Sequence, residues 1–167
     1  MDRPVRKPMR LKDFDYSAPG AYFLTICTRD KRCIFSRIVV GDGALAVPQV
    51  VLSEIGIVVD AVICSMEEHY PYISVDKYVL MPNHVHLLVR IKSGGPSGAT
   101  APTRAVIPSF VSTLKSLSVR RCDEKLWQRS FYDHVIRDDE EYRKIAEYID
   151  GNPARWAEDR FFPADYP

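Results

Sequence analysis

The run YVLMPNHVHLLV, residues 78–89, decides the fold that this sequence predicts. Apolar residues, many of them β-branched, lie on both sides of Pro82-Asn83, a pair that suits the centre of a tight turn. We therefore expect two antiparallel strands, over residues 74–81 and 84–92, joined directly by this turn.

The second of these strands carries two histidines, His84 and His86. Side chains alternate between the faces of a strand, so both imidazoles share one face while Val85 and Leu87 point into a core. Two neutral imidazoles side by side supply half of a divalent-metal site. They could equally be two surface histidines, and the pair alone does not decide between these interpretations.

The composition is that of a soluble globular protein. A chain of 167 residues with 46% hydrophobic and 27% charged residues predicts one domain, over residues 1–167. No apolar run reaches membrane-spanning length, and the basic N-terminus lacks the apolar core of a signal peptide. The four cysteines form no C-x-x-C pair, which favours free thiols in a reducing compartment. We therefore expect a cytoplasmic protein without a membrane partner.

The remaining pattern predicts an α+β fold of the ferredoxin-like type, β-α-β-β-α-β, with an antiparallel sheet and an additional C-terminal helix. The composition of residues 1–19 predicts a basic arm, and the glycines and prolines of residues 93–106 predict a flexible linker. The other predicted elements are a strand over 22–28, a short strand within 34–40, helices over 48–68 and 108–121, a strand over 130–136 and a last helix over 139–150.

The last helix begins with a capping pattern, in which Asp138 is followed three residues later by Glu141. Its apolar stripe includes Tyr142, whereas Tyr148 falls on the polar side. Asn152 comes one turn after Tyr148, so a phenol and an amide oxygen would point the same way. An amide oxygen can complete a metal site, and a phenol beside such a site is a candidate nucleophile.

Basic residues gather in two regions, while residues 138–150 are mostly acidic. This asymmetry fits a protein with one phosphate-facing side, although charged arms are often simply solvated. Trp127 and Phe131 could stack on bases or anchor the core, and His134 is most simply a structural hydrogen-bonding group. The basic residues that could contact the phosphates of a nucleic acid, and DNA if the resemblance described below holds, are Arg6, Arg10, Lys12, Lys115, Arg120, Arg121 and Arg129.

Two motifs together carry a resemblance to a known family. Residues 81–89 (MPNHVHLLV) and 147–153 (EYIDGNP) resemble the single-tyrosine HUH transposases, and most closely their REP-associated tyrosine transposase branch. Residues 10–17 and 126–137 are also similar to that branch, so the resemblance covers nearly the whole chain apart from the linker.

The resemblance implies an enzyme that nicks and rejoins single-stranded DNA with hairpin, REP-like elements, acting as a monomer or a homodimer. It implies that His84 and His86 bind Mg²⁺ or Mn²⁺, with Asn152 as a third ligand. Tyr148 would attack phosphorus, giving a 5′-phosphotyrosine and a free 3′-OH. The family usually has glutamine where this chain has Asn152, which leaves that ligand the least secure.

Two other functions stay open at this point. A ferredoxin-like sheet can bind hairpin or single-stranded nucleic acid without catalysis, so the chain could be a binding module derived from a transposase. It could also be a hydrolase that uses metal-bound water, which would form no covalent intermediate.

Overall fold

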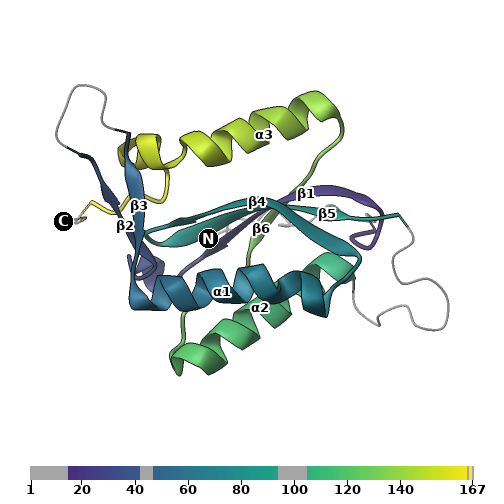
Figure 1. The fold of residues 1–167 in the computed structure, drawn as a ribbon, viewed down its shortest axis with the longest axis horizontal. Helices are drawn as coiled ribbons and strands as arrows, with labels where there is room; N and C mark the ends of the chain where they lie inside the picture. The colour runs from purple at the N-terminus through teal and green to yellow at the C-terminus, as the bar shows by residue number, and fades with distance from the viewer. Residues whose placement is uncertain (1–14, 42–46, 94–104, 165, 167) are drawn as a thin grey trace, which may run out of the picture.

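A four-stranded antiparallel sheet separates two layers of helices in the computed structural model, which describes residues 15–41, 47–93, 105–164 and 166 (Figure 1). Helices α1 and α2 cover one face of the sheet, and α3 crosses the other. The elements are β1 (Gly20–Cys27), the 3₁₀ turn η1 (Arg29–Lys31), β2 (Ser36–Val39), β3 (Gln49–Leu52), α1 (Glu54–His69), β4 (Ile73–Met81), β5 (His84–Ile91), α2 (Val106–Cys122), β6 (Tyr132–Val135), α3 (Asp139–Gly151) and the 3₁₀ segment η3 (Pro153–Glu158).

The strand order β4-β5-β1-β6 confirms the predicted ferredoxin-like arrangement. Strands β4 and β5 form the expected hairpin, with Met81 opposite His84 across the turn at Pro82-Asn83. Strand β1 lies between β5 and β6 and is antiparallel to both. No helix in the described ranges has the length and apolar character needed to cross a membrane.

The main core lies between the sheet and the α1–α2 layer. Alternate residues of β1 and β5 point into it, as the hairpin pattern predicts. The helices contribute side chains at helical spacing, so the apolar stripes of both helices meet the same sheet face. The largest fully buried members are Tyr22, Leu24, Ile26, Phe35, Ile63, Met66, Ile73, Leu87, Ile107 and Phe110.

The helix predicted over residues 48–68 is wrong at its start. Gln49–Leu52 form strand β3, paired with β2, and α1 begins only at Glu54. A local contact sets the start of α1: the hydroxyl of Ser53 caps the helix by accepting a hydrogen bond from the Gly56 amide at 3.0 Å. A Cβ on Gly56 would lie 1.9 Å from the carbonyl oxygen of Phe35, so only glycine fits this contact.

The start of α2 also differs from the sequence-based expectation. Helix α2 begins at Val106, two residues before the predicted start and at the end of the predicted linker. The predicted linker over residues 93–106 falls mostly on residues 94–104, which lie outside the described residues. Residues 1–14 of the predicted arm also lie outside them.

Helix α3 is attached to the sheet mainly by polar contacts. Asp138 caps its first turn by accepting from the Glu141 amide, as predicted. Of the helix residues, only Ile149 is fully buried. Three side-chain pairs join helix and sheet along its length: Tyr142 with Asp76 at 2.8 Å, Lys77 with Asp150 at 2.6 Å, and Glu141 with His134 at 2.6 Å.

Candidate metal and tyrosine site

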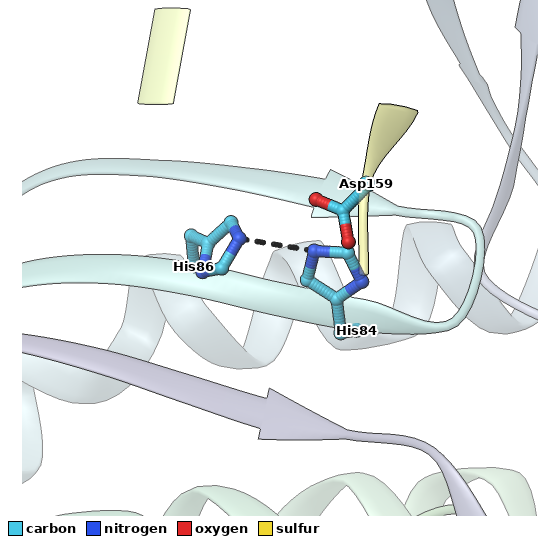
Figure 2. A group of neighbouring side chains, drawn as sticks. All are labelled: His84, His86 and Asp159. Carbon is cyan, nitrogen blue, oxygen red and sulfur yellow. Dashed lines mark hydrogen bonds between the residues drawn. The ribbon is translucent and has the colours of Figure 1, made fainter. Parts of the chain in front are cut away.

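The two histidines share the sheet face that α3 covers, as their spacing predicts. Both are buried, with exposed fractions of 0% for His84 and 2% for His86. Their imidazoles meet with the two Nε2 atoms 3.0 Å apart (Figure 2). The interpretation as surface histidines therefore does not describe this pair, because helix α3 and the segment after it bury both rings.

Hydrogen bonds on the far side of each ring orient the pair. The Asn83 side chain donates its Nδ2 to the Phe161 carbonyl at 2.7 Å, which turns its Oδ1 toward Nδ1 of His84 at 2.9 Å. His84 therefore carries hydrogen on Nδ1 and has a free lone pair on Nε2. Nδ1 of His86 lies 2.8 Å from the Thr25 hydroxyl, on the strand next to β5. Such outer partners fix ring orientation in metal sites.

Asp159 is the third potential ligand, and it comes from a part of the chain far from the hairpin. Ligand atoms of His84, His86 and Asp159 all lie within 4.8 Å of one another. In Figure 2 the carboxylate reaches down toward the histidine rings from the segment that follows η3. Trp156 and Phe161 flank Asp159 in sequence, and they hold the segment by packing against Met81 and Cys27 of the sheet.

The structure places Asn152 at the end of α3, buried at 2% exposure. Its Nδ2 lies 3.4 Å from a carboxylate oxygen of Asp159. Its Oδ1 is buried and has no hydrogen-bond partner among the described residues. A buried carbonyl oxygen without a donor is costly, and a cation bound beside it would remove that cost. Two imidazoles, a carboxylate and an amide oxygen are a donor set that could hold a divalent metal ion.

Tyr148 is half-buried and its hydroxyl points at the histidine pair. Its hydroxyl lies 3.4 Å from Nε2 of His86, and its ring meets the Phe23 ring edge-on at a centroid distance of 6.0 Å. Tyr148 is next to the buried Ile149 in sequence, and α3 directs its phenol to a polar site on the sheet. Burial is the main cause that raises the pKa of Tyr148 above its usual value, and the charge of Asp159 adds to it.

Burial also keeps both imidazoles uncharged. It lowers the pKa of His84 to about 3, with a smaller contribution from the positive charge of Arg160. It lowers the pKa of His86 well below its usual value, with His84 as the next cause. Neutral imidazoles are the form that binds metal ions, so neither ring has to release its positive charge before it ligates at neutral pH.

Several of the predicted DNA-binding residues gather at a second place. A cavity of about 790 Å³ lies between the C-terminal half of α2 and residues 125–130, and Arg120, Arg129 and Trp127 line it. Arg29 and Lys125 add two more positive charges to the lining, and Asp30 adds one negative charge. Arg121 is exposed near the end of α2 but does not line this cavity.

Lys115, also predicted to contact DNA, is engaged within the protein. Its ammonium donates to the carbonyls of Gln128 at 2.7 Å and Ser130 at 3.0 Å. Burial lowers the pKa of Lys115 to about 8. The side chain thus links α2 to the segment that leads into β6. Arg6, Arg10 and Lys12 lie outside the described residues.

Sequence reasoning selected His84, His86, Asn152 and Tyr148, and the structure brings all four together. It missed Asp159, because no sequence spacing connects that residue to the hairpin or to α3. It also missed the orienting partners Asn83 and Thr25. Asn83 lies directly before His84, so an amide at this turn was a usable signal. His134 forms the hydrogen bond with Glu141 described above, as expected of a structural residue.

No protein-family model matches the sequence. An uncharacterized protein of Haemophilus influenzae is 30% identical over 174 residues, which cover 94% of this chain and 93% of that protein. A second Haemophilus influenzae protein, assigned as a REP-associated tyrosine transposase, is 26% identical over 148 residues, 84% of this chain and 74% of that protein. The solved structure of a REP-associated tyrosine transposase bound to a REP hairpin shares the fold, with a TM-score of 0.61 and 20% identity, covering 90% of this chain and 77% of that chain.

Proposed function

The chain belongs to the REP-associated tyrosine transposase family, and from that premise we propose that it nicks and rejoins hairpin-containing single-stranded DNA. One observation carries the proposal: the Tyr148 hydroxyl lies 3.4 Å from Nε2 of His86 within a single chain. The candidate nucleophile and the candidate metal ligands therefore meet without a second subunit. A DNA-binding module would have no need of this arrangement.

We propose that His84, His86 and Asp159 hold Mg²⁺ or Mn²⁺, and that the free Oδ1 of Asn152 is a further ligand. The bound cation would polarise the scissile phosphate and offset its negative charge. Asn83 and Thr25 hold the two imidazoles in place from behind. Asp159 supplies the negative charge that the two neutral imidazoles lack, which favours a hard divalent ion.

Tyr148 is the proposed nucleophile. Its Oη forms a bond to phosphorus while the bond from phosphorus to the 3′ oxygen breaks, leaving a 5′-phosphotyrosine. The phenol loses its proton and the departing oxygen gains one, ending as a free 3′-OH. The new phosphodiester conserves the energy of the old one, so another 3′-OH can reverse the step and join strands. Because burial raises the pKa of Tyr148, the phenol enters the reaction protonated.

The basic cavity beside α2 is the proposed contact for the phosphates of the hairpin. Arg29, Arg120, Lys125 and Arg129 line it, next to the ring of Trp127. The solved relative was bound to a REP hairpin, which supports a folded single strand as the ligand. Contacts of this kind release counterions, so affinity should fall as salt concentration rises. An affinity that does not change with salt would contradict the assignment.

The test of the chemistry is incubation of the protein with end-labelled hairpin DNA and Mn²⁺. We expect a covalent protein–DNA adduct that survives denaturation, and we expect Tyr148→Phe and His84→Ala to abolish it. Tyr142→Phe is the matched control, since it removes a phenol hydroxyl from the same helix. That variant should still form the adduct.

Two other results would replace the proposal. Cleavage that continues in Tyr148→Phe, without an adduct, would indicate hydrolysis by metal-bound water. Tight hairpin binding that needs no metal, with no cleavage under any condition, would indicate a binding module.

A further inference from the structure

Two exposed side chains that the proposed chemistry does not use lie at the edge of the metal site, Tyr132 and Arg160. Tyr132 stands opposite Thr25 in the pairing of β6 with β1, and Thr25 stands opposite His86 in the pairing of β1 with β5. The three residues form one row across adjacent strands and share a sheet face. Strands lie roughly 4.8 Å apart, so the backbone of Tyr132 lies about 10 Å from that of His86.

Arg160 joins this row from the segment that carries Asp159. Its guanidinium carbon lies 5.1 Å from the ring centre of Tyr132 and 4.5 Å from that of Phe161. Phe161 in turn packs against the His84 imidazole at 4.7 Å between ring centroids. Aromatic faces thus hold the guanidinium close to the site. Stacking leaves the N–H donors free, and Arg160 forms no salt bridge with any residue in the described part of the chain.

The exposure of Tyr132 is unusual in this protein. Its exposed fraction is 44%, and no other aromatic side chain among the described residues is as exposed. An open aromatic ring beside a free guanidinium is suited to an unpaired nucleotide. The ring stacks on any base, and the planar fork of donors matches the oxygens of a phosphodiester.

We propose that Tyr132 and Arg160 form a subsite for one unpaired nucleotide next to the scissile phosphate. Arg160 binds the phosphodiester of that nucleotide, and the open area of the Tyr132 ring stacks on its base. The inference rests on the proposed function, because it assumes a DNA strand at the metal site. The role of both residues is positioning: they fix the strand beside Tyr148 and take no part in the exchange of bonds.

The test measures binding of a hairpin DNA with a single-stranded flank to the full chain carrying Tyr148→Phe, which prevents turnover. Each flank phosphodiester is replaced in turn by a neutral methylphosphonate, and each flank base is removed in turn. Arg160→Ala and Tyr132→Ala should each weaken binding about tenfold. At one position the methylphosphonate should weaken binding of the parent protein but not of Arg160→Ala. Loss of the adjoining base should likewise have no further effect on Tyr132→Ala.

The controls separate a contact from a change in folding. Arg143→Ala removes an exposed arginine from α3, and in this variant each DNA change should weaken binding as much as it does in the parent protein. Tyr132→Phe keeps the aromatic ring, so removal of the adjoining base should still weaken DNA binding by this variant. The subsite would be overturned if, at every flank position, the loss of affinity from the DNA change and the loss from the substitution simply added. It would also be overturned if Arg143→Ala cancelled the effect of a DNA change as strongly as Arg160→Ala does. If the wild-type protein forms no Tyr148 adduct, but the position-specific effects on binding are still observed, the proposed chemistry would be overturned and the subsite would stand.

Discussion

At the scale of single residues, the affinity of the candidate site for a metal ion depends on which side-chain oxygen joins the two histidines. The sequence points to Asn152, whereas the structure adds the Asp159 carboxylate within 4.8 Å of both histidine ligand atoms. The two side chains also contact each other, with Nδ2 of Asn152 3.4 Å from Asp159. A carboxylate binds a divalent cation more strongly than an amide because it carries a full negative charge.

We therefore expect Asp159→Asn to weaken Mn²⁺ binding more than Asn152→Ala does. Removing an orienting partner of a metal ligand typically costs about 10- to 100-fold in affinity, and removing the charged ligand should cost at least that much. Titration of each variant with Mn²⁺, followed by calorimetry or by the electron paramagnetic resonance signal of free Mn²⁺, measures the loss. A larger loss for Asn152→Ala would restore the amide as the principal oxygen ligand.

At the scale of elements, Tyr148 lies on the helix that buries the fewest side chains among α1, α2 and α3. Helix α1 buries Val59, Val62, Ile63 and Met66, whereas α3 buries only Ile149. The polar pairs that join α3 to the sheet are largely exposed, and exposed pairs of this kind contribute little, on the order of 0–1 kcal/mol each. The histidine pair thus lies on a sheet that α1 and α2 cover with a large apolar core, whereas the helix that carries Tyr148 buries a single side chain fully.

Hydrogen exchange should reveal this difference. We expect the amides of α3 to exchange faster than those of the middle of α1, because few apolar contacts oppose local opening of α3. Mass spectrometry of peptides from the two helices, at low and high salt, measures it, and salt should increase exchange in α3 only. Equal protection of the two helices would show that the polar pairs hold α3 as firmly as a core does.

At the scale of the whole molecule, Tyr148 and the histidines come from the same chain, which favours a site complete in one monomer. We expect that mixing His84→Ala with Tyr148→Phe restores no adduct, since neither protein contains an intact site. The measurement is the same hairpin assay with the two variants at equal concentration. Recovery of the adduct on mixing would show that α3 acts on the site of a second chain in a homodimer.

The fold was predictable from sequence where the signals are local. Alternation on both sides of Pro82-Asn83 predicts the hairpin, and the capping pattern at Asp138 predicts the start of α3. Strand β3 was not predictable in this way, because its valines continue the apolar spacing of α1. Asp159 was not predictable because only the folding back of η3 onto the sheet brings it to the histidines. The contact of Tyr148 with the sheet was hard to predict from its place on the polar side of α3, because its partner there is a polar site and not the apolar core.

The hydrogen bonds around the histidine pair have one further consequence. Asn83 fixes hydrogen on Nδ1 of His84, so the 3.0 Å contact between the two Nε2 atoms requires the hydrogen of His86 to sit on Nε2. That nitrogen must be bare to ligate. In the proposed metal complex the hydrogen of His86 would have to lie on Nδ1 instead, where the Thr25 hydroxyl would accept from it rather than donate to it. Thr25 is suited to both arrangements, because a hydroxyl can donate or accept and can therefore partner either tautomer of the His86 ring.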